Sequence, residues 1–188
     1  MVSQIQPHFL YNALTSIAQL CEKNPSKAKK ATIDFSDYLR RNMNSLKEQS
    51  PVSFESELKH LETYLSLEKM RFGDDLNIEY DIQTTDFLIP SLTVQPLVEN
   101  AVKHGVGMKE DGGTVTIATR EYDNRFEVIV SDDGVGFDTE KKPDDGRTHI
   151  GMENVRNRLK TMCNAVLNIK SKIGVGTTAT ITIPKEDI

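Results

Sequence analysis

The sequence predicts an α+β protein in which a helical hairpin precedes an antiparallel or mixed sheet with helices on one face. Apolar residues recur every three to four positions through residues 1–72, which is the spacing of helices with one buried stripe. From Leu76 onward apolar and polar residues alternate, as in a strand. The charge changes at the same point: residues 1–72 hold 10 Lys and Arg against 8 Asp and Glu, and residues 73–188 hold 13 against 20. These changes predict two functional parts.

Two amphipathic helices joined by a tight turn are expected in residues 1–50. The turn is Asn24-Pro25-Ser26, and Ser26 is a suitable N-cap for the second helix. The first apolar stripe contains Ile5, Phe9, Leu10, Ala13, Leu14, Ile17 and Leu20, and the second contains Ala28, Ala31, Phe35, Tyr38, Leu39, Met43 and Leu46. Because a lone hairpin cannot bury both stripes, we expect two copies to form a four-helix bundle.

A third helix in residues 51–73 is expected to connect the hairpin to the second domain. Ser50-Pro51 ends the hairpin, Ser53 starts the new helix and Gly73 caps its end. Residues 74–188 then form one domain. Its predicted strands are 76–82, 114–119, 126–130, 166–169 and 178–183, and its predicted helices are 90–104, closed by Gly105, and 153–162.

The composition excludes several classes of protein. The 188 residues are 37% hydrophobic and 27% charged, as in globular domains, and a net charge of −5 argues against a generally basic nucleic-acid surface. No apolar run approaches the roughly 18 residues that span a bilayer, so we expect a cytoplasmic chain without direct membrane contact. Its abrupt helical opening predicts a longer parent protein with membrane segments before it. Cys21 and Cys163 are expected to be buried apolar thiols.

A proline and a histidine interrupt the first apolar stripe. Pro7 removes a backbone donor and is expected to kink the helix, and such strain often has a local use. His8 follows it, and Asn12 lies one turn further along the same face. A neutral imidazole can be a nucleophile towards phosphorus, and an amide one turn away can orient it. An ordinary surface or core histidine is the alternative interpretation.

Three polar residues, Asn100, Lys103 and His104, share one face of the helix predicted over 90–104. An amide oxygen is a suitable magnesium ligand, and a lysine beside it would meet phosphate oxygens. A solvated polar face explains the same three residues equally well.

Asp132 follows the predicted strand 126–130 and precedes Gly134 and Gly136. A carboxylate at a strand end can accept a hydrogen bond from an exocyclic amine such as that of adenine. The glycines let the backbone approach a flat ring or a phosphate closely. The spacing fits neither a dinucleotide fingerprint nor a calcium loop, and a plain β-turn is the alternative.

Two further glycine-containing stretches are candidate binding segments. Gly151 stands where a polar loop meets a predicted helix start, and the free amides of a helix N-terminus attract phosphate. Gly176 and Thr177 lie in the turn before the last strand, for which a turn without further function is the simpler interpretation.

The order of these stretches, over nearly the whole chain, resembles that of sensor histidine kinases of the LytS type. A Pro-His-Phe-Leu-Tyr-Asn helix is followed by Asn-Ala-x-Lys-His, Asp-x-Gly-x-Gly and Gly-x-Gly-Thr. The first segment is specific to that kinase group, whereas the others are shared across the GHKL superfamily of ATP-binding domains. The resemblance implies a dimeric four-helix bundle followed by a GHKL-type α/β sandwich with a mixed, mainly antiparallel sheet.

The same resemblance implies a role for each candidate residue. The phosphoacceptor would be His8. The magnesium ligand and the residues near the phosphates would be Asn100, Lys103 and His104. The adenine pocket would be formed by Asp132, Gly134 and Gly136. Residues 138–150 would be the ATP lid with Gly151 as its hinge, and Gly176 and Thr177 would belong to the last motif.

The implied function is autophosphorylation of His8 from ATP and Mg²⁺ in a homodimer, followed by transfer to an aspartate of a response regulator. Three residues depart from related proteins. Phe9 replaces an acidic residue that could act as a base, a function that Asn12 cannot supply, and His149 replaces a glycine of the lid. Pro96 stands where ATP-hydrolysing GHKL proteins carry a glutamate, and Glu99 lies on a different helix face, which favours transfer to a side chain over hydrolysis. The alternatives are a GHKL serine kinase or ATPase switch, and a non-catalytic nucleotide-binding dimer.

Overall fold

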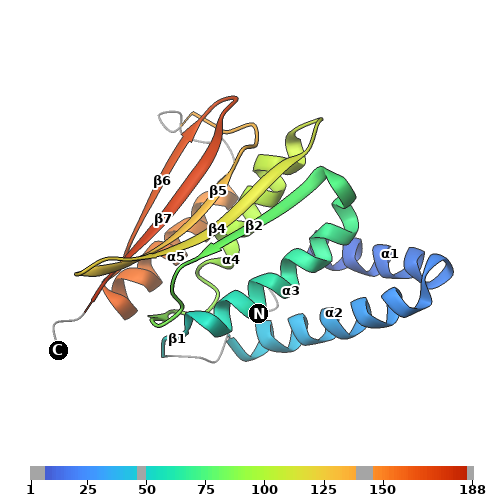
Figure 1. The fold of residues 1–188 in the computed structure, drawn as a ribbon, viewed down its shortest axis with the longest axis horizontal. Helices are drawn as coiled ribbons and strands as arrows, with labels where there is room; N and C mark the ends of the chain where they lie inside the picture. Colours follow the sequence, from blue (N-terminus) through green and yellow to red (C-terminus); the bar gives the residue numbers. More distant parts are fainter. Residues whose placement is uncertain (1–6, 46–49, 139–145, 186–188) are drawn as a thin grey trace.

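The computed structural model describes residues 7–45, 50–138 and 146–185, with the backbone alone at 146–150. The fold is α+β, as the sequence predicts (Figure 1). The helices are α1 (Pro7–Lys23), α2 (Pro25–Ser45), α3 (Phe54–Phe72), α4 (Gln95–Asn100) and α5 (Gly146–Cys163), with single turns η1 (Gly73–Asp75), η2 (Ala101–Gly105) and η3 (Val106–Met108). The strands are β1 (Val52–Ser53), β2 (Leu76–Ile82), β3 (Leu88–Ile89), β4 (Gly113–Glu121), β5 (Arg125–Asp132), β6 (Val166–Lys172) and β7 (Gly176–Pro184).

The hairpin of α1 and α2 packs against α3, on the side of the molecule away from β6 and β7 (Figure 1). The ring of Phe9 lies 5.0 Å from that of Tyr38 on α2 and 5.1 Å from that of Tyr64 on α3. Part of the hairpin's apolar stripe is therefore covered within one chain, which the sequence did not indicate. Leu14 and Met43 of the predicted stripes remain exposed.

The connecting helix α3 has the ends that its sequence predicts. The hydroxyl of Ser53 accepts a hydrogen bond from the Ser56 backbone N–H at 3.3 Å, which satisfies a free donor of the first turn. At the other end Gly73, with a φ of 60°, donates its N–H to the carbonyl of Lys69. The helix passes beside both the hairpin and β2, so it joins the two halves of the molecule (Figure 1).

The main sheet has the strand order β2-β4-β5-β7-β6, and α4 and α5 cover one of its faces (Figure 1). The β2–β4 pair is parallel and the other pairs are antiparallel, so the sheet is mixed and mainly antiparallel. Val128 and Val130 of β5, with Ile181 of β7, are buried on the covered face. Asp132 is the last residue of β5 and comes two positions after Val130, so it belongs to the same face of the sheet. It pairs with Thr177 of β7.

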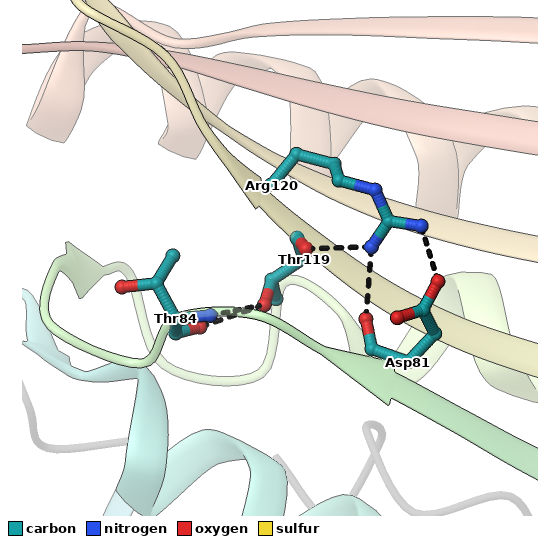
Figure 2. Close-up of polar contacts among 4 residues, drawn as sticks. All are labelled: Asp81, Thr84, Thr119 and Arg120. Atoms are coloured by element: carbon teal, nitrogen blue, oxygen red, sulfur yellow. Dashed lines mark hydrogen bonds and ion pairs between the residues drawn. The ribbon is translucent and has the colours of Figure 1, made fainter.

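Polar contacts fix the outer end of the edge strand β2 against β4 (Figure 2). The Arg120 guanidinium forms an ion pair with the Asp81 carboxylate and donates to the Asp81 carbonyl at 3.0 Å. The fully buried Thr119 hydroxyl donates to the Thr84 carbonyl at 2.7 Å and accepts from the Thr84 N–H at 3.2 Å. These contacts set the parallel register before the chain turns towards β3.

The predicted helix over 90–104 is shorter and less regular than expected. Residues 90–94 form a turn in which Leu92 has a φ of 55°, so α4 begins only at Gln95. After Asn100 the helix widens into the single π-turn η2. Such π-turns often lie at functional sites, because they rotate the following side chains relative to the preceding α-helix.

Two further expectations, on α5 and Cys21, are wrong, one small sheet was not expected, and the predicted kink is not tested. Strands β1 and β3 form a two-stranded antiparallel sheet that the sequence does not reveal. Helix α5 begins at Gly146, earlier than the predicted start at 153. Cys21 is exposed, so its predicted burial is wrong. The predicted kink at Pro7 involves residues 1–6, which lie outside the described residues. In the part of the chain that is described, no helix is both long and apolar enough to cross a bilayer.

Candidate nucleotide and phosphoacceptor site

Asp132 is half-buried at the end of β5, where the sheet meets η2. Its Oδ1 accepts a hydrogen bond from the Gly134 backbone N–H at 3.0 Å. Burial raises the pKa of this carboxyl above its ordinary value, while hydrogen bonds from the Gly134 and Thr177 backbones hold it down. The second oxygen, Oδ2, leaves the carboxylate able to accept a further hydrogen bond.

Three backbone segments meet around Asp132, and they can do so only because glycines stand there. A Cβ on Gly105 would lie 2.3 Å from Oδ1 of Asp132, and a Cβ on Gly134 would lie 2.1 Å from the Gly105 carbonyl carbon. No other residue fits at Gly134, because its Cβ would meet backbone, whereas a Cβ on Gly105 would require the Asp132 carboxylate to move. Gly105 was expected only to close a helix, so its contact with Asp132 is a site feature that the sequence analysis missed.

A cavity of about 240 Å³ opens beside this junction, at the ends of β5, β6 and β7. Asp132, Gly176 and Thr177 line it together with residues of β6. Ser171 of β6 holds the wall: its hydroxyl lies 2.9 Å from the Thr177 hydroxyl and accepts from the Phe137 N–H at 2.9 Å. Ser171 does not lie in a recognisable sequence motif. Its place beside the cavity becomes apparent only from its pairing with Thr177 in the sheet.

Asn100, Lys103 and His104 lie on the side of α4 and η2 that faces away from the core. Asn100 and Lys103 are half-buried and His104 is exposed, whereas Ala101 and Val102 are buried. Burial lowers the pKa of the Lys103 ammonium, and the negative charge of Glu99 opposes that shift. Because Gly105 is the last residue of η2, this polar face lies next to the place where Gly105 meets Asp132.

Asn100 and Gly151 are brought to neighbouring elements. The Asn100 amide nitrogen lies 3.8 Å from the sulfur of Met152 on α5, and Gly151 precedes that methionine. Gly151 lies inside α5, so its predicted place at a helix start is wrong.

The predicted lid falls largely on residues 139–145, outside the described residues, as does the His149 side chain. Gly136, at the other end of that segment, is half-buried against Lys172.

Glu99 points into the molecule, away from the Asn100 face, as expected. It is buried, and its Oε1 accepts a hydrogen bond from the Gln95 carboxamide at 2.7 Å. Burial raises the pKa of Glu99. A carboxylate so placed does not line the Asp132 cavity, and Pro96 in the first turn of α4 has no acid–base group.

His8 and Asn12 form a separate exposed pair on α1. The Asn12 amide nitrogen lies 3.2 Å from Nδ1 and 3.4 Å from Nε2 of His8. The next residue, Phe9, is buried in the aromatic cluster with Tyr38 and Tyr64, which fixes the rotation of α1 and directs His8 outward. An exposed, oriented imidazole can act as a nucleophile towards a donor that approaches from outside the helix.

Comparison with known proteins gives two family matches. Residues 1–76 match the family model of histidine kinases, and residues 86–187 match that of histidine kinase-, DNA gyrase B- and HSP90-like ATPases. The solved histidine kinase domain of the Erythrobacter litoralis EL346 blue-light activated kinase has a TM-score of 0.56 at 18% identity, covering 95% of this chain and 96% of that one. The mycobacterial sensor histidine kinase MprB has a TM-score of 0.53 at 16% identity, covering 74% and 99%. These structures share the fold.

Relatives align over almost the whole chain. The Bacillus subtilis protein YwpD is 39% identical, over 96% of this chain and 67% of its own length. The sensor histidine kinase YpdA of Escherichia coli is 36% identical, and the sensor protein LytS of Bacillus anthracis is 32% identical. Each of these two alignments covers 98% of this chain and 33% of the relative, so the chain spans one third of those sensor proteins. The chain belongs to the histidine kinase family, in the group of the LytS sensor proteins.

Proposed function

We propose that this chain binds ATP with Mg²⁺, phosphorylates itself on His8 and passes the phosphoryl group to an aspartate of a response regulator. The half-buried carboxylate of Asp132, held where Gly105 and Gly134 approach each other, is the observation that carries the proposal. It offers a fixed acceptor beside glycines that carry no side chain, which suits the amino group and flat ring of adenine.

The residues around Asp132 fit the rest of the nucleotide. Lys103 and His104 supply positive or hydrogen-bonding groups for phosphate oxygens on the neighbouring polar face. The Asn100 amide oxygen is a suitable ligand for Mg²⁺, whose chemistry is to neutralise charge on the phosphates. Gly151 would lie near the lid, and Gly176 and Thr177 would close the adenine side of the pocket.

At His8 the reaction forms a bond between a ring nitrogen and the γ-phosphorus, and the bond to the leaving ADP oxygen breaks. The attacking nitrogen must carry no hydrogen, and the other nitrogen releases its proton as the phosphohistidine forms. Asn12 can hold the ring in one orientation but cannot accept that proton, and the exposure of His8 leaves water as the acceptor. The catalytic contribution of the protein is positioning more than covalent chemistry.

The hairpin surface supports a homodimer and a docking partner. Tyr11, Leu14, Ile33 and Met43 are exposed apolar residues on α1 and α2. A second copy of the hairpin would cover them in a four-helix bundle. His8 would remain accessible to the receiver domain of a response regulator, as its outward direction on α1 requires.

The test is incubation with γ-labelled ATP and Mg²⁺, with His8→Ala as the comparison. We expect label that is acid-labile, alkali-stable and absent from His8→Ala. Asn100→Ala and Asp132→Ala should lose nucleotide binding as well as label. Transfer is then checked by adding a receiver domain and following loss of label from the chain.

Other outcomes would identify the alternatives. Acid-stable label that persists in His8→Ala would show serine or threonine chemistry, and release of phosphate without label would show an ATPase switch. Nucleotide binding without either reaction would show a non-catalytic dimer. Nucleotide binding that is unchanged in Asp132→Ala would refute the assignment of the pocket.

A further inference from the structure

Gln95, the first residue of α4, lies at the centre of a buried polar network that joins three helices. Its amide nitrogen donates to the Tyr38 hydroxyl on α2 at 2.7 Å and to Oε1 of Glu99 on α4 at 2.7 Å. Its amide oxygen lies 2.8 Å from Nε2 of His60 on α3. Gln95 is 4% exposed, so water does not replace these partners.

The partners fix the orientation of the Gln95 carboxamide. The ionised form of Glu99 can only accept, so the Gln95 amide nitrogen must face it, and the amide oxygen must face His60. In this orientation the Gln95 amide oxygen can accept from the His60 tautomer that carries its hydrogen on Nε2, an atom that also lies 3.3 Å from the Asn42 amide nitrogen. Burial lowers the pKa of His60, in keeping with a neutral imidazole. Both donors and one acceptor site of Gln95 are thus used, each by a different side chain.

Tyr38 extends the network to the helix that carries His8. Its ring lies 5.0 Å from that of Phe9, the residue next to His8, and stacks on the His60 ring at 5.2 Å with 2° between the planes. Tyr38 is 1% exposed. One side chain thus contacts α1 and α3 through its ring and α4 through its hydroxyl.

Glu99 extends the network in the other direction. It precedes Asn100 in the chain, and its charge acts on Lys103 one turn later. A continuous series of contacts therefore runs from the neighbour of His8 to the neighbour of Asn100, through Phe9, Tyr38, Gln95 and Glu99. Each member is buried, and an unpaired polar group at any of these positions would be costly.

We propose that Tyr38 and Gln95 are positioning residues for phosphoryl transfer, which hold the helix of His8 in a fixed orientation relative to the helix of Asn100. This inference rests on the proposed function. Neither residue touches the nucleotide cavity or His8 itself, so both act through their neighbours. Small errors in placement between donor and acceptor lower transfer rates strongly, and the hydrogen bonds of Gln95 limit those errors.

The test is Tyr38→Phe, which removes one hydroxyl and keeps the ring against Phe9 and His60. Tyr64→Phe is the matched control: Tyr64 is also fully buried and its ring also contacts Phe9, but its hydroxyl donates to Glu68 on the same helix at 3.2 Å. We expect Tyr38→Phe to lower kcat for His8 phosphorylation by about tenfold, with KM and Kd for ATP unchanged. Tyr64→Phe should leave kcat unchanged while it loses a comparable amount of stability in urea unfolding.

A double variant tests whether the two residues act together. Gln95→Met removes all three hydrogen bonds with little change in side-chain length, so kcat should fall at least as far as in Tyr38→Phe. Tyr38→Phe should then lower kcat no further in a Gln95→Met background, because the interaction is already lost. Circular dichroism and urea unfolding establish that each variant is folded before its rate is compared.

Several results would overturn the inference. Equal effects of Tyr38→Phe and Tyr64→Phe on kcat would show a merely structural role, and fully additive effects in the double variant would show that the residues act separately. A faster rate in Tyr38→Phe would show a restraining contact instead. A wild-type chain that gives no label on His8 would refute the proposed function together with this inference. A labelled wild type with equal rates in every variant would refute the inference alone.

Discussion

Asp132 illustrates how a site residue depends on glycines that are distant in sequence. Its own motif places the carboxylate before Gly134, whose N–H donates to it, and Gly105 from the turn after α4 leaves the space that the carboxylate fills. A Cβ on Gly134 would clash with the Gly105 backbone, and a Cβ on Gly105 would clash with the Asp132 carboxylate. At this position the backbone of Gly134 packs directly against the backbone of Gly105.

Gly105→Ala is therefore expected to weaken nucleotide binding. The new Cβ would lie 2.3 Å from Oδ1 of Asp132, so the carboxylate must move and lose its present position. A hydrogen bond to a charged group contributes about 1.5–3 kcal/mol, so Kd for ATP should rise by at least about tenfold. Isothermal titration calorimetry measures this change.

Gly107→Ala is the control for the Gly105 variant. A Cβ on Gly107 would lie 2.8 Å from the Val102 carbonyl oxygen and 3.1 Å from the Phe72 ring, but it would not meet Asp132. Alanine there should lower the stability of the fold and leave ATP affinity unchanged. Unchanged affinity in Gly105→Ala would mean that Asp132 does not bind the nucleotide in this arrangement.

The contrast between Asp132 and Gln95 shows what the sequence can and cannot reveal about single residues. Asp132 and its glycines form a local motif whose chemistry can be interpreted without the fold. Gln95 and Ser171 have no such motif, because their partners Tyr38 and Thr177 are brought to them only by folding. The role of Gly105 was missed for the same reason, although the glycine itself was noticed as a helix end.

Among the elements, α3 has an unexpected second task. Beyond connecting the hairpin to the sheet, it holds the turn that precedes α4. The Glu57 carboxylate accepts the backbone N–H groups of Leu92 at 3.1 Å and Val94 at 3.2 Å. Leu92 has a φ of 55°, a left-handed conformation that is strained for leucine. Glu57 therefore stabilises the backbone that sets where α4 begins.

The titration of Glu57 should make the stability of the fold depend on pH. Burial raises its pKa from 4.5 to about 7, against the backbone hydrogen bonds that hold it down. Between these values the folded chain binds a proton that the unfolded chain does not, so the free energy of unfolding falls as pH rises through this window. The full change is about 3 kcal/mol, which is lost once pH exceeds the folded pKa.

Glu57→Gln isolates this contribution because glutamine does not titrate. Urea unfolding of both proteins at pH 5 and pH 8 gives the difference in their unfolding free energies. Other groups, including His60, titrate in both proteins and cancel in that difference. We expect the wild type to lose about 2 to 3 kcal/mol relative to Glu57→Gln between the two pH values, slightly less than the full change because unfolded Glu57 is already mostly ionised at pH 5. A difference that does not change with pH would contradict a raised pKa at Glu57.

Element prediction succeeds where a period is long enough to observe. The helices α1, α2 and α3, predicted from their apolar stripes, and the strand β2, predicted from its alternation, are confirmed by the structure. Strands β1 and β3 have two residues each, too few for any period, and they exist because they pair with each other. The turn before α4 was expected to be helical, but its backbone is held by hydrogen bonds from Leu92 and Val94 to Glu57 of α3 rather than by a helix of its own.

In the whole molecule, one continuous core extends from the hairpin to the sheet. Phe9, Tyr38 and Tyr64 belong to the same buried cluster as Val130 and Ile181 of the main sheet. The two halves that differ in charge and period are therefore packed as one body in this structure. The sequence indicated the two halves, but the contact between them depends on α3, whose buried side chains face the hairpin and, through His60, reach Gln95 of α4.

The exposed apolar residues of the hairpin lead to the final prediction, which concerns assembly. Leu14 is 53% exposed although its stripe was expected to be buried, since α3 covers only part of the hairpin. A second copy would bury it, so Leu14→Lys should raise the dimer dissociation constant by at least about tenfold in sedimentation velocity runs over a concentration series. Val166→Lys is the control, because Val166 is 63% exposed on the edge strand β6, far from the hairpin. A wild type that stays monomeric, or equal dissociation constants in both variants, would place the dimer interface elsewhere or remove it.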